Sequence, residues 1–112
     1  MTLPAATPTS LYSLMRDSLL HWGYADTTLT QPSLDSILGS EAGLVPTTDV
    51  YIGVDSNVRN VAGGGGTYQG VLAAAGKNYS LQDFGPRGMI DPNQVWLYNV
   101  AGTTVDVTFQ AR

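Results

Sequence analysis

The chain has 112 residues, of which 43% are hydrophobic and only 12% are charged, a size and composition typical of one globular domain with a weakly charged surface. Its net charge of −4 and its five scattered basic residues argue against binding to nucleic acid, which requires clustered lysine and arginine. Because the chain contains no cysteine, disulfide bonds, thiolate metal sites and cysteine nucleophiles are excluded.

Residues 1–9 contain two prolines and three threonines, and they predict an extended arm without a core of its own. The arm is either free or lies against a neighbouring subunit, in which case Leu3 is the candidate contact. The N-terminus lacks the basic start and apolar run of a secretory signal, and no stretch reaches the ~20 apolar residues of a membrane span. We therefore expect a soluble protein that is made in the cytoplasm and has no membrane partner.

A helix is predicted over about residues 11–22. Its apolar residues recur at the spacing of one helical stripe and are Leu11, Leu14, Met15, Leu19 and Trp22. Ser10, or Thr9 if the boundary is one residue earlier, is the predicted N-cap, and Gly23 stands where a left-handed C-cap is expected. This stripe packs either on a sheet or on a partner, so Leu11 and Trp22 are candidate interface residues.

Residues 24–46 are rich in Thr, Ser, Pro and Gly and predict an extended connection that wraps its own domain or contacts something else. Within it, Ser33 is a possible cap for a short helical turn over residues 34–38, which Gly39 would end.

The β-region is expected to begin at about Thr48. Alternation over residues 50–54 predicts a strand with one buried face, and residues 58–61 follow as a second short strand after a turn. A glycine run at 63–66 predicts a flexible tip, from which residues 67–72 return. Residues 77–82 are a further candidate strand, and residues 84–93 a loop. Short strands with turns every eight to twelve residues are typical of a β-sandwich or small barrel.

The strongest β-signal is in residues 94–110, where two strand-like runs flank Ala101-Gly102 and predict a β-hairpin. A three-residue loop with Gly102 in the left-handed region places the inward residues of both runs on one face, and these are Val95, Leu97, Val105 and Val107, with Phe109 next in line. Trp96 and Tyr98 are left on the opposite face. Either a second sheet or the helix covers these two side chains, or they form an interface, since Trp and Tyr are frequent anchors of subunit contacts and carbohydrate platforms.

No set of residues specifies a reaction, and we expect a protein that is not an enzyme and has no cofactor, metal or catalytic residue. His21 is the single histidine, and without a second histidine or a cysteine it predicts neither a zinc site nor a triad. The glycine run lacks the spacing of a phosphate-binding loop, so it is read as a mobile tip, or as a tip that orders on contact with a partner. Asp55-Ser56-Asn57 is interpreted as an Asx turn rather than a calcium loop.

The β-region contains a succession of short strand and turn motifs, which are Asp49-Val50-Tyr51-Ile52-Gly53, Ser56, Val58, Ala75-Gly76, Tyr79-Ser80-Leu81, Ile90-Asp91, Val95-Trp96-Leu97-Tyr98, Ala101-Gly102-Thr103 and Val105-Asp106-Val107. In this succession the chain resembles small virion proteins of tailed bacteriophages. The resemblance covers about residues 48–111 and implies a compact β-domain used as a capsid decoration (cement) protein or as a head or tail accessory module. It leaves the helix and the connection before Thr48 without an explanation.

These observations together predict a mainly β chain with two parts. Residues 1–46 form the arm, the helix and the wrapping segment, and residues 47–112 form the β-domain. The expected function is that of a capsid decoration protein that binds the assembled shell as a homo-oligomer, with a trimer favoured, and stabilises it within the virion. Its partners would be the major capsid protein or other virion proteins. The alternative is a tail or head-fibre module that binds a receptor or glycan. The expected interface residues are Trp96, Tyr98, Leu3, Leu11 and Trp22.

Overall fold

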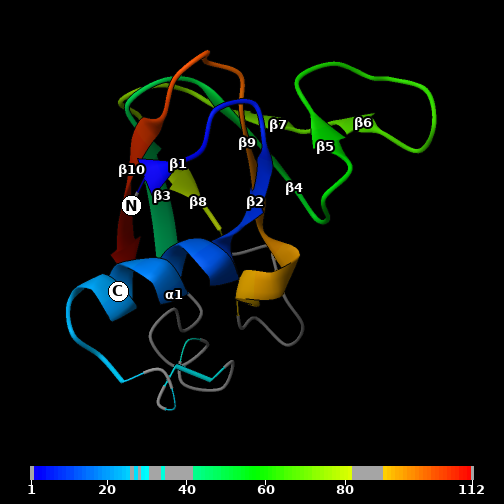
Figure 1. Ribbon diagram of the computed structural model, residues 1–112. Helices are drawn as coiled ribbons and strands as arrows, with labels where there is room; N and C mark the ends of the chain where they lie inside the picture. Colours follow the sequence, from blue (N-terminus) through cyan, green and yellow to red (C-terminus); the bar gives the residue numbers. More distant parts are fainter. Residues whose placement is uncertain are drawn as a thin grey trace.

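The structure is a computed structural model of the chain, and it describes residues 2–25, 27, 29–30, 34, 42–81 and 90–111. This part of the chain is mainly β, with two four-stranded antiparallel sheets and one α-helix, consistent with the predicted small β-sandwich (Figure 1). The strands are β1 (Thr2–Leu3), β2 (Pro8–Ser10), β3 (Ala42–Pro46), β4 (Val50–Gly53), β5 (Val58–Arg59), β6 (Tyr68–Gln69), β7 (Val71–Ala73), β8 (Tyr79–Ser80), β9 (Trp96–Asn99) and β10 (Val105–Ala111). The mainly β prediction is therefore confirmed.

The strand order is β1-β10-β3-β8 in one sheet and β2-β9-β4-β7 in the other. We call these the first and the second sheet. Three of the strands, β1, β2 and β3, come from residues before Thr48, where the sequence predicted no strand. β1 and β2, with two and three residues, are too short to show alternation, so their pairing with β10 and β9 is a tertiary effect.

The predicted hairpin of residues 94–110 is wrong. β9 pairs with β2 and β4 in the second sheet, whereas β10 pairs with β1 and β3 in the first. The connection over residues 100–104 therefore carries the chain from one sheet to the other. Each strand is central in its own sheet, with a neighbour on both edges, and two central strands gain more backbone hydrogen bonds than one hairpin would supply.

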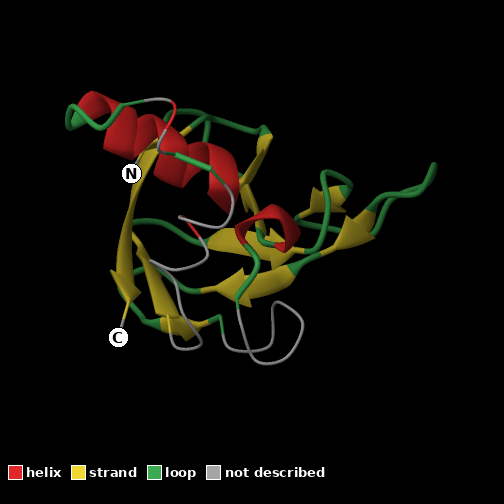
Figure 2. Cartoon of the chain, turned by 90° about the horizontal axis from the view of Figure 1, so that it is seen from below, coloured by secondary structure: helices red, strands yellow, loops and turns green. Residues whose placement is uncertain are grey.

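The strand prediction for residues 67–72 also needs correction. These residues divide into β6 and β7, and β6 pairs with β5 in parallel, with Val58 opposite Tyr68. The glycine-rich residues 60–67 are thus a crossover between parallel strands rather than the tip of an antiparallel hairpin. Figure 1 shows this loop extending away from both sheets, and Figure 2 shows it on the opposite side of the molecule from the helix.

Helix α1 (Leu11–His21) closely follows the prediction. The Ser10 hydroxyl caps it by accepting a hydrogen bond from the Ser13 amide at 3.2 Å, and Gly23 has the predicted left-handed conformation with φ of +95°. The N-terminal half of the stripe, including Leu14 and Met15, is buried in the core. The last residue of the predicted stripe is not buried, because Trp22 lies beyond the final turn and is 75% exposed.

One continuous hydrophobic core joins the helix and the two sheets. It includes Val95, Leu97, Val105 and Val107, as the sequence predicts, and Phe109 is half-buried at its margin. Strand β8 is shorter than the predicted 77–82. The predicted helical turn at 34–38 lies outside the described residues apart from Leu34, which is buried, and the predicted loop at 84–93 is described only from residue 90 onward.

The β5–β6 pair is anchored on the outside of the second sheet by close packing at two glycines. Val58 is fully buried, and a Cβ atom added at Gly53 or at Gly70 would come within 2.7 Å and 2.6 Å of its side chain, respectively. The Tyr68 hydroxyl accepts hydrogen bonds from the amides of Val54 and Asp55 at 2.8 Å and 3.1 Å. Glycine is needed at these two positions, one at the end of β4 and one between β6 and β7, because neighbouring atoms leave no room for a side chain.

Candidate functional site

The five expected interface residues occupy three different environments. Leu3 and Leu11 are fully buried in the core of the chain itself, so they are not available to a partner in this conformation. Trp96 and Tyr98 are half-buried, and Trp22 is exposed. In this conformation the domain's own core removes both side chains from water without a partner, so neither is a surface contact of the single chain.

Trp96 and Tyr98 belong to an aromatic face on the outside of the second sheet. In the strand register, Tyr98 lies opposite Tyr51 of β4, and Tyr51 lies opposite Leu72 of β7. These side chains share a face because the alternate residues of each strand point into the core. We define the aromatic face as Tyr51, Leu72, Trp96 and Tyr98. No local pattern in the sequence marks Tyr51 and Leu72 for this face, since only the register of three strands brings them beside the predicted pair.

The β5 strand covers part of the aromatic face. The guanidinium carbon of Arg59 lies 5.5 Å from the centre of the Tyr98 ring, within the range of a cation–π contact. The Trp96 indole Nε1 donates a hydrogen bond to the carbonyl oxygen of Asn93, at 3.0 Å, on the 3₁₀ helix η3 (Pro92–Gln94). These contacts hold the side chains of Tyr98 and Trp96 in place without a partner protein. The open end of the face is Leu72, which is 47% exposed on the edge strand β7.

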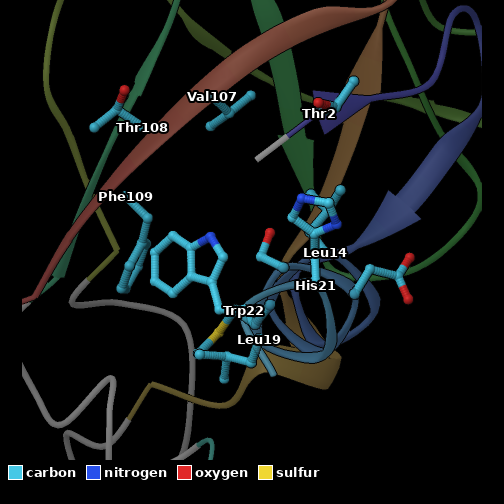
Figure 3. Close-up of a pocket in the computed structure, with 11 residues that line it drawn as sticks. Thr2, Leu14, Leu19, His21, Trp22, Val107, Thr108 and Phe109 are labelled. Atoms are coloured by element: carbon cyan, nitrogen blue, oxygen red, sulfur yellow. The ribbon is translucent and has the colours of Figure 1, made fainter. Parts of the chain in front are cut away.

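A groove between α1 and β10 is the second candidate site. Its volume is about 850 Å³, and its lining residues are Thr2, Leu14, Met15, Asp17, Ser18, Leu19, His21, Trp22, Val107, Thr108 and Phe109. Figure 3 shows the Phe109 side chain directed from β10 toward the indole ring of Trp22 at the end of the helix. The groove therefore combines an aromatic wall with aliphatic residues from both elements.

Polar groups surround this apolar surface. Asp17, Ser18 and His21 come from the helix, and Thr2 and Thr108 come from β1 and β10. The set contains hydrogen-bond acceptors, hydroxyls and an imidazole, so the groove offers both donors and acceptors to a polar ligand. Trp22 and His21 were each considered from the sequence, but their position in one groove with Phe109 was not predicted. Phe109 lies 87 positions further along the chain than Trp22.

Asn99 is a buried polar residue that no local pattern in the sequence marks. Its Nδ2 atom donates to the carbonyl oxygens of Leu3, Pro4 and Thr103 at 3.3, 3.2 and 3.0 Å, and its Oδ1 accepts from the Ala101 amide at 2.8 Å. The side chain thus joins the N-terminal segment to the connection between the two sheets. A buried amide whose donors and acceptor are all used specifies one arrangement of the backbone around it.

The remaining sequence motifs have structural roles. The Asp55 carboxylate accepts a hydrogen bond from the Asn57 amide at 2.9 Å, which confirms the predicted Asx turn. In the glycine run, Gly65 and Gly66 have positive φ angles of 71° and 89°, which explains why glycine stands there. In the described ranges, no group of three or more His, Cys, Asp or Glu residues is placed to hold a metal ion.

Comparison of the chain with protein-family models, with curated proteins and with solved structures finds no match. Among the helices that the structure describes, none is long and apolar enough to cross a membrane.

Proposed function

We propose that the chain is a structural protein of a phage particle, a capsid decoration protein that binds the assembled shell as a homo-oligomer and stabilises it. The observation that carries the proposal is the aromatic face, on which Tyr51, Trp96 and Tyr98 are held by the sheet and lead to the exposed Leu72. Rigid aromatic residues beside an exposed apolar edge are typical of the centre of a protein interface. The resemblance of residues 48–111 to phage virion proteins supports the same function.

Such a protein stabilises the shell by mass action. It binds the assembled state and not the separated subunits, so its binding free energy is added to the free energy that resists rupture. The weakly charged surface, with 12% charged residues, lowers the desolvation cost of burying a large part of the chain between shell subunits. The Arg59 guanidinium lies over the Tyr98 ring and would be desolvated together with it.

The test compares particles assembled with and without the chain. Particles without it should rupture at a lower temperature in a dye-accessibility assay, and adding back the purified chain should restore the higher value. Leu72→Asp, which puts a charge on the aromatic face, should abolish the restoration. Val100→Asp is the matched control, because Val100 is similarly exposed but lies on the connection after β9. Equal rupture temperatures with and without the chain would refute the proposal.

The groove favours a second candidate function, that of a tail or head-fibre module binding a receptor or glycan. An exposed Trp beside hydroxyl, carboxylate and imidazole groups suits a sugar ring, whose apolar face stacks on indole while its hydroxyls form hydrogen bonds. Titration with a glycan panel should then change Trp fluorescence in a saturable way, and Trp22→Phe should remove the change while Trp96→Phe keeps it. A flat titration across the panel rejects this candidate.

A further inference from the structure

The N-terminal segment crosses from one sheet to the other within a few residues. Strand β1 pairs with β10 in the first sheet, and β2 pairs with β9 in the second. Residues 4–7 are the hinge between them. Strand β1 consists of only two residues, Thr2 and Leu3, which lie opposite Asp106 and Val105. It stands at the edge of its sheet, so its removal would leave β10 with an unpaired edge.

The site that receives β1 is built from residues near the other end of the chain. Leu3 inserts its side chain fully into the core beside β10. Asn99 donates hydrogen bonds to the carbonyl oxygens of Leu3 and Pro4. The site is therefore specific for an apolar side chain followed by two correctly placed carbonyl groups, and every copy of this chain carries both the site and the segment that fits it.

The hinge is held in an unfavourable conformation. Ala6 has φ of 48°, and in the described part of the chain it is the one residue other than glycine with a positive φ. Its amide donates to the Asn99 carbonyl oxygen at 2.9 Å, which holds the reversal in place. An alanine in the left-handed region is strained because its Cβ crowds the backbone, and the strain disappears if the hinge extends.

We propose that the chain forms dimers by strand exchange, in which β1 of each copy occupies the β1 site of a second copy. Every contact of Leu3 and the Asn99 side chain is kept in the exchanged state, while the hinge relaxes as Ala6 leaves the left-handed region. Short, strained hinges favour this kind of exchange over the closed form at high protein concentration. Since Thr2 lines the groove between α1 and β10, the groove of each exchanged subunit is completed by the second copy's Thr2.

The inference does not depend on the proposed function, because exchange is measured on the isolated chain. The two single variants Thr2→Cys and Asp106→Cys are purified, mixed and oxidised. Paired residues of antiparallel strands lie within disulfide range, and the chain has no native cysteine to confuse the result. A disulfide between these two variants forms efficiently only if β1 of one chain docks on β10 of the other.

Ser56→Cys mixed with Thr2→Cys is the control for random collisions, since Ser56 is also exposed but is not paired with β1. Docking should raise the yield of the Thr2–Asp106 cross-link about tenfold or more over this control, because it gives the two sulfurs a high effective concentration. Ala6→Gly, which removes the strain of the closed hinge, should lower that yield. Cross-linking no better than the Ser56 control at every protein concentration would overturn the proposal, and it would leave the shell-binding test unaffected.

Discussion

Replacing Asn99 by alanine should destabilise the fold by about 2–4 kcal/mol. The variant loses the hydrogen bonds of the buried amide, in which three carbonyl groups share the two Nδ2 hydrogens and one backbone amide donates to Oδ1. At about 1 kcal/mol net for each bond, and with buried backbone groups left unsatisfied, the loss is a large part of the ~5–15 kcal/mol that holds a domain of this size together. The melting temperature should fall by roughly 10–20 °C.

The assay is urea unfolding followed by circular dichroism, with Asn57→Ala as the matched control. Asn57 is exposed in the turn after Asp55, and its replacement should change the unfolding free energy by less than about 0.5 kcal/mol. If Asn99→Ala unfolds with the same free energy as Asn57→Ala, the reasoning that this amide joins the two sheets is refuted.

In the Asn99→Asp variant, the same buried site should make the stability of the fold depend on pH. The introduced carboxylate would face the carbonyl oxygens of Leu3, Pro4 and Thr103, so the folded state disfavours the charged form and raises the pKa of the carboxyl group. The unfolded chain ionises at about pH 3.9, and stability is therefore lost as the pH rises above that value. The free energy of unfolding of Asn99→Asp should be close to that of Asn99→Ala near pH 4 and clearly lower at pH 7. If the two variants differ in unfolding free energy by the same amount at both pH values, this prediction is wrong.

Two further substitutions test the local packing and the helix start. Gly53→Ala should lower the free energy of unfolding by about 1–3 kcal/mol, because the added Cβ would overlap Val58. Gly64→Ala, which has open space around it, should leave stability nearly unchanged. Equal melting temperatures for the two variants would disprove the close packing. Ser10→Ala should cost about 1 kcal/mol by removing the hydroxyl that accepts from the Ser13 amide, and an unchanged melting temperature would show that this cap contributes nothing.

Local chemistry made several features predictable from the sequence. Ser10 and Gly23 bound the helix because a side-chain oxygen satisfies an amide at the start and glycine tolerates the left-handed end. The inward positions of β9 and β10 followed from the alternation of side chains, and the Asx turn at Asp55 followed from its own carboxylate. Each of these signals lies within a few residues of the feature it predicts.

The candidate sites were only half predictable for the same reason. Trp96, Tyr98 and Trp22 stood out as large aromatic residues, but their neighbours come from distant segments. Tyr51 joins the aromatic face only through the β4–β9 register, and Phe109 joins the groove only because β10 lies beside the helix.

What the sequence by itself determined is therefore the local structure of the chain: the helix and its caps, the strand periodicity and the inward-facing core residues. Tertiary structure alone decided which strands pair, and it placed β9 and β10 in different sheets although the intervening turn favours a hairpin. The physical reason is that a turn contributes a few local contacts, whereas each of these strands gains two neighbours and a share of one core by pairing elsewhere. The buried Asn99, which no local pattern marks, holds the crossing between the sheets in place.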